Sequence, residues 1–575
     1  MKHFLWKIGG EAGFGILTTG LVFSKIASRL GYYVFDFIQY PSLIRGGHNT
    51  YDVGFADKPV YSLKQDIDLL VCLNQETFTQ HADRLSPDSL VLYDSSEFDC
   101  VGPYKKVSVP FKKILTDLKG QVVMKNTIAL GATIALLGGD INILYDLLTS
   151  QFQKKGQNIV DFNKQFAQAG YDHIQSQYSA YIKNRLEKVD NQEGLVMSGN
   201  EVFSLGCVLA DCKLYVAYPM TPSSSVLSVL ADWQDKTGML ARHAEDEISV
   251  INTALGGSIA GVRSAVGTSG GGFALMVETV SFAGIAEIPL VIFLSQRPGP
   301  ATGMPTWTEQ GDLLFAVHAG HGEFPKIVLA PGDNDEMLDL TLAAFDLADI
   351  YQTPVIMLSD MLLSESHRSI SKQKVQNLIK THKVDRGKFV LEPDVVPYKR
   401  YKITDDGISP RLVPGAKEAY YQSNSYEHLE DGHTSEEAHV RINQIDKRAR
   451  KMTAYLQKHF KGPIVLGDYK NADTVFITWG STKGAVQEAR KILDEDGIKT
   501  AQLHFTYLHP LDPQIITPFF KDKKRYIAVE NNSRGQFEKL LSMELGIKIK
   551  EKILRYDGRP ILAEDIINTL QKNNK

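Results

Sequence analysis

Three turns between residues 216 and 312 carry the most distinctive chemistry in this sequence. Each turn follows a short apolar run and precedes a helical pattern, as in a strand–turn–helix unit. In chain order the turns read YPMTPSSS (218–225), TSGGG (268–272) and SQRPGPATGMPTWTEQGD (295–312). Ligands of open α/β sheets bind at the carboxyl ends of the strands, which is where these turns fall. We therefore expect the three turns to form one ligand site.

Thr221 in the first turn and Arg297 in the third could bind an anion. Thr221 precedes Pro222, a pair typical of a helix start, so the simpler interpretation is that Thr221 caps a helix. The alternative is that its hydroxyl and the following amides bind a carboxylate. Arg297 follows a predicted buried strand and is held between prolines, which suits bidentate recognition of a carboxylate. A surface arginine in a loop is the other interpretation.

Glu247 lies at the start of a helix predicted for residues 245–261. Apolar residues recur there at helical spacing and predict one apolar face: Ile248, Ile251, Leu255 and Ile259. Glu247 directly precedes this face, so its side chain could point inward and exchange a proton with a buried heterocycle. The simpler interpretation is that the three acids at 245–247 only favour the helix dipole.

The composition is that of an ordinary soluble globular protein, with 575 residues, 43% hydrophobic and 23% charged. This length suits about three or four domains. The formal net charge of −4 argues against a mainly electrostatic nucleic-acid partner. No charge-free apolar run approaches the length of about 18 residues that a membrane span needs. Lys2 and His3 lead into a strand pattern rather than a signal peptide, so we expect a cytoplasmic protein.

The four cysteines contain no cluster-binding motif. Cys72, Cys100, Cys207 and Cys212 form no Cys-x-x-Cys pair, whereas a cubane iron–sulfur cluster takes four thiolates. We interpret them as isolated reduced thiols and predict no metal site in this chain. If the protein takes part in electron transfer, the clusters must lie on another chain.

Four segments are expected along the chain: 1–185, 195–371, 372–462 and 463–575. The first opens with a glycine-rich turn and carries an Arg-Gly-Gly tip at 45–47, which could be a hairpin or a contact site. The third is polar and reads as an extended arm over another surface, with a helix from about 435 to 459. In the last segment a predicted strand ends in ENNSRGQ (530–536). The recurring strand–turn–helix pattern predicts an α/β fold of several doubly wound, mostly parallel sheets.

The chain resembles the alpha subunit of 2-oxoacid:ferredoxin oxidoreductases in four sequence runs that occur in the same order. These runs are YPMTPSS, the EDE helix start, TSGGGFALM and SQRPGPATG. It is most similar to the 2-oxoglutarate type, in which gamma and alpha subunits are fused. The resemblance assigns the gamma type to residues 1–185 and a pyrimidine-binding domain of thiamine-diphosphate enzymes to 195–371. It assigns an inter-domain arm to 372–462 and a transketolase carboxyl-terminal-like domain to 463–575.

The resemblance implies an enzyme that converts 2-oxoglutarate and coenzyme A to succinyl-CoA and carbon dioxide, reversibly, with electrons passing to ferredoxin. Such chemistry needs an electron sink that no side chain provides well and that thiamine diphosphate supplies. The family shares this cofactor with a beta subunit, which carries Mg²⁺ and a [4Fe-4S] cluster. We therefore expect an (alpha-beta)₂ assembly, and an isolated chain without iron.

Matching positions imply roles for individual residues. Glu247 would bond the aminopyrimidine ring of the cofactor and promote its activation, which needs a desolvated carboxyl group. Thr221 and Arg297 would hold the substrate's 1-carboxylate. Further contacts are implied at four positions: Tyr218 and Pro219 beside the cofactor, and Thr302 and Thr306 beside the substrate.

Two residues depart from the family pattern and leave the substrate range open. Met220 stands where the family usually has a branched residue, and Trp307 stands where a smaller or charged residue is common. The same chemistry on pyruvate or branched-chain 2-oxoacids is therefore an alternative. A non-catalytic scaffold that binds a thiamine-dependent partner is the alternative from another class.

Overall fold

The computed structural model describes all residues except 1–2, 42–46, 192–193, 418, 523 and 574–575. Arg45 and Gly46 of the predicted tip therefore lie outside the described residues. The chain divides into two compact units. Unit 1 comprises Met1–Met197, Glu365–Asn377 and Leu562–Glu564, and unit 2 comprises Ser198–Ser364, Leu378–Ile561 and Asp565–Lys575.

Unit 1 is built on an eight-stranded mixed sheet. The strand order is β6 (Lys105–Ser108), β5 (Leu85–Tyr93), β4 (Ile67–Cys72), β1 (Phe4–Glu11), β3 (His48–Ala56), β2 (Tyr33–Gln39), β14 (His367–Ser371) and β7 (Gly194–Ser198). β1, β4, β5 and β6 are parallel, whereas β3 is antiparallel to β1 and β2. β1 is buried along all but its last residue, as expected for a strand covered on both faces.

The helices of unit 1 pack tightly through glycines. They are α1 (Ile16–Arg29), α2 (Gln75–His81), α3 (Phe111–Asp117), α4 (Lys125–Leu136), α5 (Ile141–Phe152) and α6 (Gln157–Gln177). Every residue of α4 is buried. A Cβ at Gly131 would lie 1.9 Å from the Ala167 carbonyl oxygen, and one at Gly170 would lie 2.1 Å from that of Ile128. Only glycine lets the backbones of α4 and α6 approach this closely.

The larger sheet of unit 2 has seven strands and is parallel except at one edge. Its order is β20 (Tyr507–His509), β12 (Ile327–Leu329), β13 (Pro354–Asp360), β11 (Leu290–Gln296), β10 (Arg263–Thr268), β8 (Cys212–Ala217) and β9 (Leu240–His243). Only β20 runs antiparallel to its neighbour. The α/β fold predicted from the sequence is confirmed.

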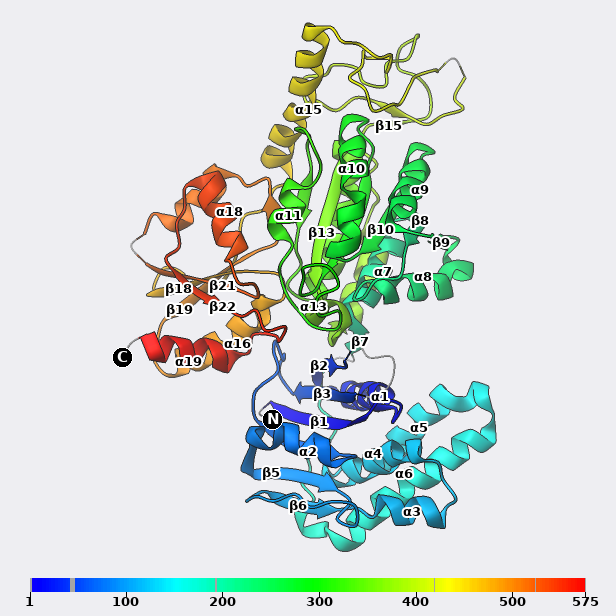
Figure 1. The fold of residues 1–575 in the computed structure, drawn as a ribbon, viewed down its shortest axis with the longest axis vertical. Coiled ribbons are helices and arrows are strands. Elements are labelled where there is room, and N and C mark those ends of the chain that lie inside the picture. Colours follow the sequence, from blue (N-terminus) through cyan, green and yellow to red (C-terminus); the bar gives the residue numbers. More distant parts are fainter. Residues whose placement is uncertain (1–2, 42–46, 192–193, 418, 523, 574–575) are drawn as a thin grey trace. The chain divides into compact units, whose positions relative to one another are not determined.

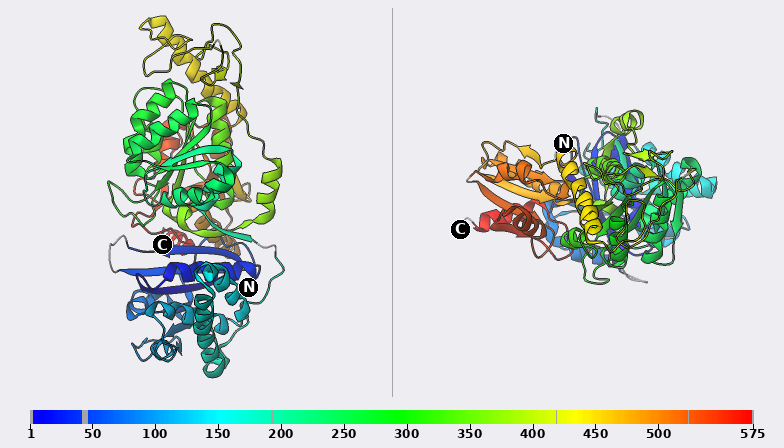
Figure 2. Two further views of the ribbon diagram at one scale, coloured as in Figure 1. Left: turned by 90° about the vertical axis from the view of Figure 1, so that its right-hand side faces the viewer. Right: turned by 90° about the horizontal axis from the view of Figure 1, so that it is seen from above.

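Helices cover both faces of this sheet (Figure 1; Figure 2 gives two further views). They are α7 (Gly199–Leu209), α8 (Ser224–Thr237), α9 (Glu247–Ile259), α10 (Gly270–Ile285), α11 (Leu313–His318), α12 (Asn334–Tyr351) and α13 (Met361–Glu365). The strands are accordingly apolar throughout, and all seven residues of β11 are buried. Parallel strands covered on both faces place their carboxyl ends, and the turns that follow them, at one edge.

A five-stranded sheet forms the carboxyl-terminal part of unit 2. Its order is β17 (Ile464–Gly467), β19 (Thr500–Phe505), β18 (Thr474–Trp479), β21 (Arg525–Glu530) and β22 (Glu551–Leu554). The helices α16 (Thr482–Glu495), α17 (Pro513–Ile516), α18 (Gln536–Leu545) and α19 (Ala563–Asn573) accompany it. β20, which follows β19 in the chain, pairs with β12 and so ties this part to the larger sheet.

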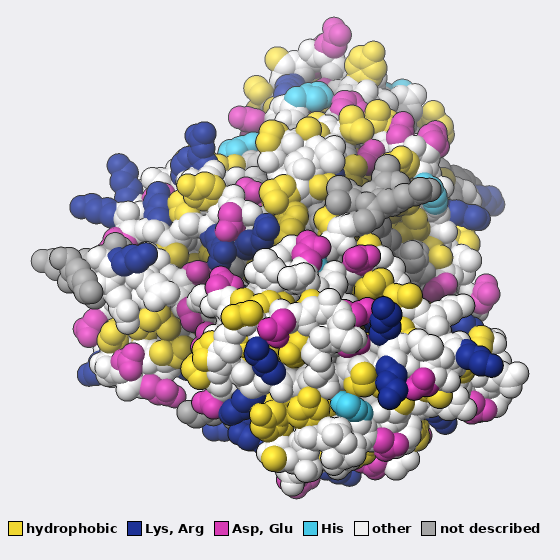
Figure 3. Space-filling model, turned by 60° about the horizontal axis from the view of Figure 1, so that its bottom comes forward, with side chains coloured by type: hydrophobic (Ala, Val, Ile, Leu, Met, Phe, Trp, Pro, Cys, Tyr) yellow, Lys and Arg dark blue, Asp and Glu magenta, His cyan; other side chains and the backbone are white. Residues whose placement is uncertain are grey.

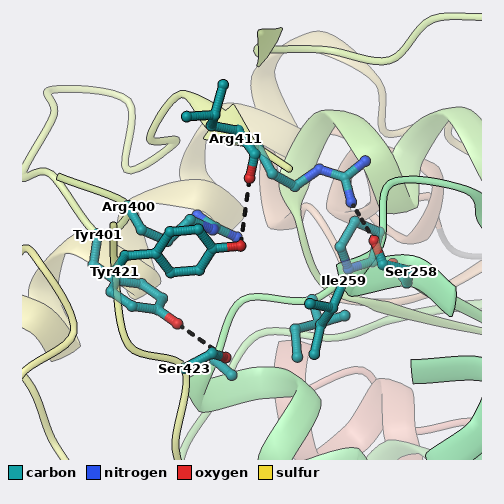
Figure 4. Close-up of a pocket in the computed structure, with 11 residues that line it drawn as sticks. Ser258, Ile259, Arg400, Tyr401, Arg411, Tyr421 and Ser423 are labelled. Atoms are coloured by element: carbon teal, nitrogen blue, oxygen red, sulfur yellow. Dashed lines mark hydrogen bonds between the residues drawn. The ribbon is translucent and has the colours of Figure 1, made fainter. Parts of the chain in front are cut away.

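Between the two sheets of unit 2 the chain forms a long, nearly strand-free arm. After α14 (Lys372–Thr381) it makes only the short pair β15 (Phe389–Val390) and β16 (Arg411–Leu412), and then enters α15 (Ala438–Lys458). The arm lies over the ends of helices α9, α10 and α12, where its basic side chains bond carbonyl groups. Arg411 donates to the Ser258 carbonyl (3.4 Å), and Arg400 donates to that of Glu287 (2.6 Å). Figure 4 shows Arg411 pointing to Ser258.

Cations at these positions are favourable because helix carboxyl termini carry partial negative charge and carbonyls without helical partners. Arg386 bonds the Gly261 carbonyl just after α9 (2.9 Å), and Lys451 bonds the Gln352 carbonyl just after α12 (3.1 Å). These contacts explain how a segment with little secondary structure of its own holds a defined position. They lie at the helix ends remote from the three turns.

Glu287 anchors α15 through two buried lysines. Lys447 and Lys451 each lie 2.5 Å from a Glu287 carboxylate oxygen, and all three side chains are at most 1% exposed. Burial lowers the pKa of Lys447 to about 7 and that of Lys451 to about 8, although Glu287 opposes the shift. Burial alone would raise the Glu287 pKa, but Lys447, Lys451 and Arg400 outweigh it and hold that pKa below its usual range.

Replacing Glu287 with glutamine is expected to destabilise the docked arm by about 3 kcal/mol near neutral pH, because two buried lysines lose their counter-charge. The loss should shrink at about pH 9. In the folded protein the pKa values of Lys447 and Lys451 lie below the pKa of lysine in the unfolded chain. At about pH 9 both side chains are therefore largely neutral in the folded protein. Limited proteolysis of the arm and thermal unfolding at both pH values measure the effect.

Asp394→Asn is the matched control, because the Lys402–Asp394 pair lies on the same arm but is about one-third exposed on each side. Its loss is expected to cost less than about 1 kcal/mol. Equal losses in the two variants would show that the buried cluster does not anchor the arm.

Surface charge is mixed on the face shown in Figure 3, where basic and acidic side chains are interspersed. This pattern agrees with the small formal net charge of −4. Across the described part of the chain, we find no helix with the length and apolar character needed to cross a bilayer.

Candidate active site

The turns after β8, β10 and β11 meet at one edge of the larger sheet, as the sequence predicts. Gly267 in β10 is level with Ala217 in β8 and with Phe293 in β11. The first and third turns are joined directly, because Nη1 of Arg297 donates to the backbone carbonyl of Thr221 at 2.7 Å. Thr221 and Arg297 are both half-buried. The structure thus brings this hydroxyl-bearing residue and this cation together.

Thr221 does not cap a helix, so that interpretation was wrong. α8 begins at Ser224, and its N-cap residue is Ser223, whose side chain makes no cap bond. The Ser223 hydroxyl instead donates to the Met220 carbonyl at 2.9 Å. The chain therefore turns over Thr221 and Pro222 before the helix starts, and the Thr221 hydroxyl takes no part in capping.

Glu247 is the first residue of α9, and its side chain is buried at 4% exposure. The N-cap residue is Asp246, which accepts from the Ser249 amide at 2.7 Å. Glu247 precedes Val250 and Ile251 by three and four residues, which places it on the buried face itself. The predicted face was partly wrong, because Ile248 is 51% exposed.

The Glu247 carboxylate has an unsatisfied oxygen. Among the described residues, its Oε1 is buried and has no hydrogen-bond partner. The second turn lies directly against it, because a Cβ at Gly272 would fall 2.5 Å from Glu247 Oε1 and 2.2 Å from Thr268 Oγ1. A side chain at this position would displace the Glu247 carboxylate or the Thr268 hydroxyl. A buried acceptor left without a donor costs about 1–3 kcal/mol, which points to a ligand that donates a hydrogen bond.

Asp312 is a site residue that the sequence reasoning left without a role. Its amide donates to Oε1 of Gln296 at 2.9 Å, and a Cβ at Gly270 would lie 2.5 Å from its Oδ2. Burial raises the pKa of Asp312 to about 6, although Arg297 opposes this shift. Burial also lowers the pKa of Arg297, an effect that Asp312 opposes. The sequence signal was an acid before a predicted helix, which is equally typical of a cap.

The remaining predicted residues differ in their exposure. Thr306 is 5% exposed, whereas Thr302 lies on the surface. Pro219 is exposed, and Tyr218 is 38% exposed with its ring 5.8 Å from that of His243. Large apolar side chains remain exposed on the elements of this edge: Tyr218, Ile248, Leu275 and Met304. Such side chains suit a surface that another molecule covers.

The cysteines are free and buried, but they are not isolated as predicted. They interact in two pairs, Cys72 with Cys100 and Cys207 with Cys212. Burial, and then the contact with Cys100, raises the pKa of the Cys72 thiol, and burial and Cys212 do the same for Cys207. Within the described ranges, no group of three or more His, Cys, Asp or Glu residues is arranged to hold a metal ion.

Two family profiles match most of the chain. One, described as pyruvate flavodoxin/ferredoxin oxidoreductase, thiamine diP-bdg, matches residues 205–447 and so includes all three turns. The other, described as pyruvate ferredoxin/flavodoxin oxidoreductase, matches residues 5–173.

Individual relatives agree with these profiles. The 2-oxoacid:ferredoxin oxidoreductase subunit alpha of Saccharolobus solfataricus is 32% identical, over 98% of this chain and 96% of its own. The 2-oxoglutarate synthase subunit KorA of Methanocaldococcus jannaschii is 29% identical, over 59% of this chain and 88% of its own.

A solved structure matches over the whole length. The 2-oxoglutarate:ferredoxin oxidoreductase from Magnetococcus marinus, with 2-oxoglutarate, coenzyme A and succinyl-CoA bound, aligns with a TM-score of 0.90 at 30% identity and covers 100% of both chains. Sequence and fold thus agree along the full chain. The chain belongs to the family of 2-oxoacid:ferredoxin oxidoreductase alpha subunits.

Proposed function

We propose that the chain is the alpha subunit, of fused gamma-alpha type, of a 2-oxoglutarate:ferredoxin oxidoreductase that forms succinyl-CoA and carbon dioxide, reversibly, in the cytoplasm. The observation that carries this proposal is the buried Glu247 carboxylate with an unsatisfied oxygen, on the same sheet edge as Arg297. The full-length match to the Magnetococcus marinus enzyme and the match to a KorA subunit support 2-oxoglutarate as substrate.

The residues present fit the aminopyrimidine of thiamine diphosphate. Glu247 Oε1 is a buried acceptor that lacks a donor among the described residues, and Gly272 keeps the space beside it free of a side chain. When bound, the cofactor supplies the electron sink for the electron pair that remains as carbon dioxide leaves. Glu247 would hold and move a proton at the aminopyrimidine ring, and Tyr218 and Pro219 would border the cofactor.

Arg297 and Thr221 would bind the 1-carboxylate of the 2-oxoacid, with Thr306 and Thr302 close to the substrate. The guanidinium already donates one bond to the Thr221 carbonyl, which fixes its orientation and leaves other N–H groups for the substrate. The carboxylate loses its charge as carbon dioxide forms. A moderate clamp therefore serves the reaction better than a very tight one.

A beta subunit would complete the site. The exposed apolar side chains Tyr218, Ile248, Leu275 and Met304 lie on the turns and helices of this sheet edge and would be covered by this partner. The beta subunit would carry Mg²⁺, the diphosphate and a [4Fe-4S] cluster in an (alpha-beta)₂ assembly. Coenzyme A would be the acyl acceptor and ferredoxin the electron acceptor.

Reconstitution with the beta subunit of the same complex tests this function. Coenzyme A-dependent reduction of ferredoxin is measured with 2-oxoglutarate, pyruvate and branched-chain 2-oxoacids. A kcat/KM at least about tenfold higher for 2-oxoglutarate is expected, because a second carboxylate offers another charged contact. A preference for pyruvate would support the pyruvate alternative. A complex that contains thiamine diphosphate but has no turnover on any 2-oxoacid would support a scaffold role.

Asp312 makes substrate binding depend on pH. Its carboxyl group, with a pKa of about 6, faces the cation that would bind the substrate anion. Above this pH its negative charge competes for Arg297, so the KM for the 2-oxoacid is expected to rise through about pH 6 by about three- to tenfold. Asp312→Asn should remove this dependence and give the lower KM at neutral pH. A KM that rises in the variant at every pH would show instead that Asp312 is needed to hold Arg297.

A further inference from the structure

We propose that the carboxyl-terminal part of unit 2 acts as a clamp on the third turn, and that Gln536 is a positioning residue for Asp312 and, through it, Arg297. The proposal rests on the function assigned to the third turn above. It gives a role to the ENNSRGQ run (530–536), for which the sequence offered none.

Gln310 carries the first contact. All its polar groups bond to the carboxyl-terminal part, and the residue has 0% exposure. Its backbone N–H donates to the Asn531 carbonyl (2.7 Å), and its side-chain Oε1 accepts from the backbone N–H of Asn531 (2.9 Å). Its Nε2 donates to the Trp479 carbonyl (2.8 Å), and its own carbonyl accepts from Asn532 Nδ2 (3.2 Å). The third turn is therefore tied to another sheet two residues before Asp312.

Gln536 carries the second contact and bonds on both sides of Asp312. Its Nε2 donates to the Gly311 carbonyl at 2.5 Å, and its Oε1 accepts from the Leu314 amide at 2.9 Å. The Asp312 amide is itself held by Gln296. One side chain from α18 thus bonds the backbone on both sides of Asp312.

The third contact involves Trp307, one of the residues that depart from the family pattern. The Arg559 guanidinium carbon lies 3.3 Å from the centroid of the Trp307 ring, and the Thr308 amide donates to the Gly558 carbonyl at 3.1 Å. Cation–π stacking of this kind stabilises by about 0.5–2 kcal/mol. Trp307 thus joins the third turn to the carboxyl-terminal part.

The surface that contacts the turn is held together by the buried Glu530 carboxylate. Glu530 accepts from the Phe537 and Glu538 amides at the start of α18, at 3.0 and 3.1 Å, and from Nε1 of Trp479 at 3.1 Å. Glu530 also accepts from Asn532 Nδ2 at 2.9 Å. An acid that bonds amides at a helix start is favoured by the helix dipole. A receptor held in this way can fix the turn rather than follow its movements.

Hydrogen–deuterium exchange of the full chain tests the clamp without relying on activity. Gln536→Ala is expected to speed exchange at the backbone amides of Gln310, Asp312 and Leu314 by at least about tenfold. The local opening that permits exchange no longer has to break the two hydrogen bonds of Gln536. Gln502→Ala is the matched control. Gln502, in β19 of the five-stranded sheet, also makes two bonds, to the Thr478 hydroxyl and the Lys483 carbonyl, and neither bond involves the turn.

The reconstituted complex gives the second readout. Gln536→Ala should raise the KM for the 2-oxoacid about tenfold and change kcat by less than about threefold, because the turn is misplaced while Glu247 is not. Arg559→Ala, which acts at the Trp307 end, should produce a smaller change in the same direction and serves if Gln536→Ala folds poorly.

Unchanged exchange at residues 308–314 in Gln536→Ala and in Arg559→Ala would overturn the clamp, and so would an equal increase in Gln502→Ala. Faster exchange in a complex without 2-oxoacid turnover would support the clamp and reject the proposed function. The two failures are therefore distinguishable.

Discussion

Replacing Glu247 with glutamine is expected to lower kcat of the reconstituted complex by about 10²–10⁴-fold, the usual contribution of a positioned acid–base group. Glutamine keeps the shape and buried position of the side chain but cannot take up the proton that a carboxylate can. The KM for the 2-oxoacid should change little, because Arg297 and Thr221 remain in place. Steady-state reduction of ferredoxin at saturating thiamine diphosphate measures the effect.

Glu245→Gln is the matched control on the same helix start. Glu245 is exposed and accepts from the Ser249 hydroxyl at 3.0 Å. It should keep kcat within about twofold of the wild-type value, as expected for an exposed charge. Unchanged turnover in Glu247→Gln, with the assembly intact, would remove the assigned role and favour the scaffold alternative.

Stability gives a separate signature of the Glu247 site. The chain alone retains a buried carboxylate oxygen without a hydrogen bond among the described residues. Glu247→Leu removes this oxygen, so the thermal midpoint of the isolated chain should be no lower than that of the wild type, while activity is lost. A residue that serves only packing would behave in the opposite way, because its replacement lowers stability first.

Arg297→Lys is expected to raise the KM for the 2-oxoacid about 10- to 100-fold, corresponding to the loss of a charge-assisted hydrogen bond of about 1.5–3 kcal/mol. The guanidinium can bond the Thr221 carbonyl and a carboxylate at once, whereas a lysine ammonium lacks this fixed fork. Arg297→Ala should have a larger effect. Initial rates across a range of 2-oxoacid concentrations separate KM from kcat.

Arg242→Ala controls for the loss of a positive charge from the same sheet, because Arg242 is an exposed residue of β9. Its KM should stay within about twofold of the wild-type value, as expected for a screened surface charge. An Arg297→Ala enzyme with an unchanged KM would place the substrate carboxylate elsewhere. The exposed third-turn residue Thr302 would then be the next to test.

Local pattern was enough to place the principal turns, because apolar runs that end at glycine, proline and polar residues mark where strands stop. The position of Glu247 before a helical run allowed an inward direction, and the structure buries the side chain. The error at Ile248 shows the limit of such patterns. A helix turns by about 100° per residue, so Ile248 points well away from the direction of the buried Glu247. Only the packing of α9 decides which of its residues are buried and which are exposed.

Contacts between distant segments could not be read from the sequence. The Thr221–Pro222 pair looked like a helix start, but the turn is shaped by Arg297, which lies 76 residues away. β14 joins the sheet of unit 1 through a pairing of Arg368 with Phe35, although it follows six of the seven strands of the larger sheet in the chain. Cys72 and Cys100 were likewise expected to be isolated and instead interact.

The amino-acid order alone was sufficient for the α/β class, for the meeting of the three turns at one edge of the sheet and for the family. These depend on periods of a few residues and on short runs whose chemistry is local. The unsatisfied oxygen of Glu247, the raised pKa of Asp312 and the bonds of Gln536 to the third turn emerged only in the folded molecule. Desolvation and hydrogen bonding depend on what surrounds a group in space, and those surroundings come from segments up to 225 residues apart.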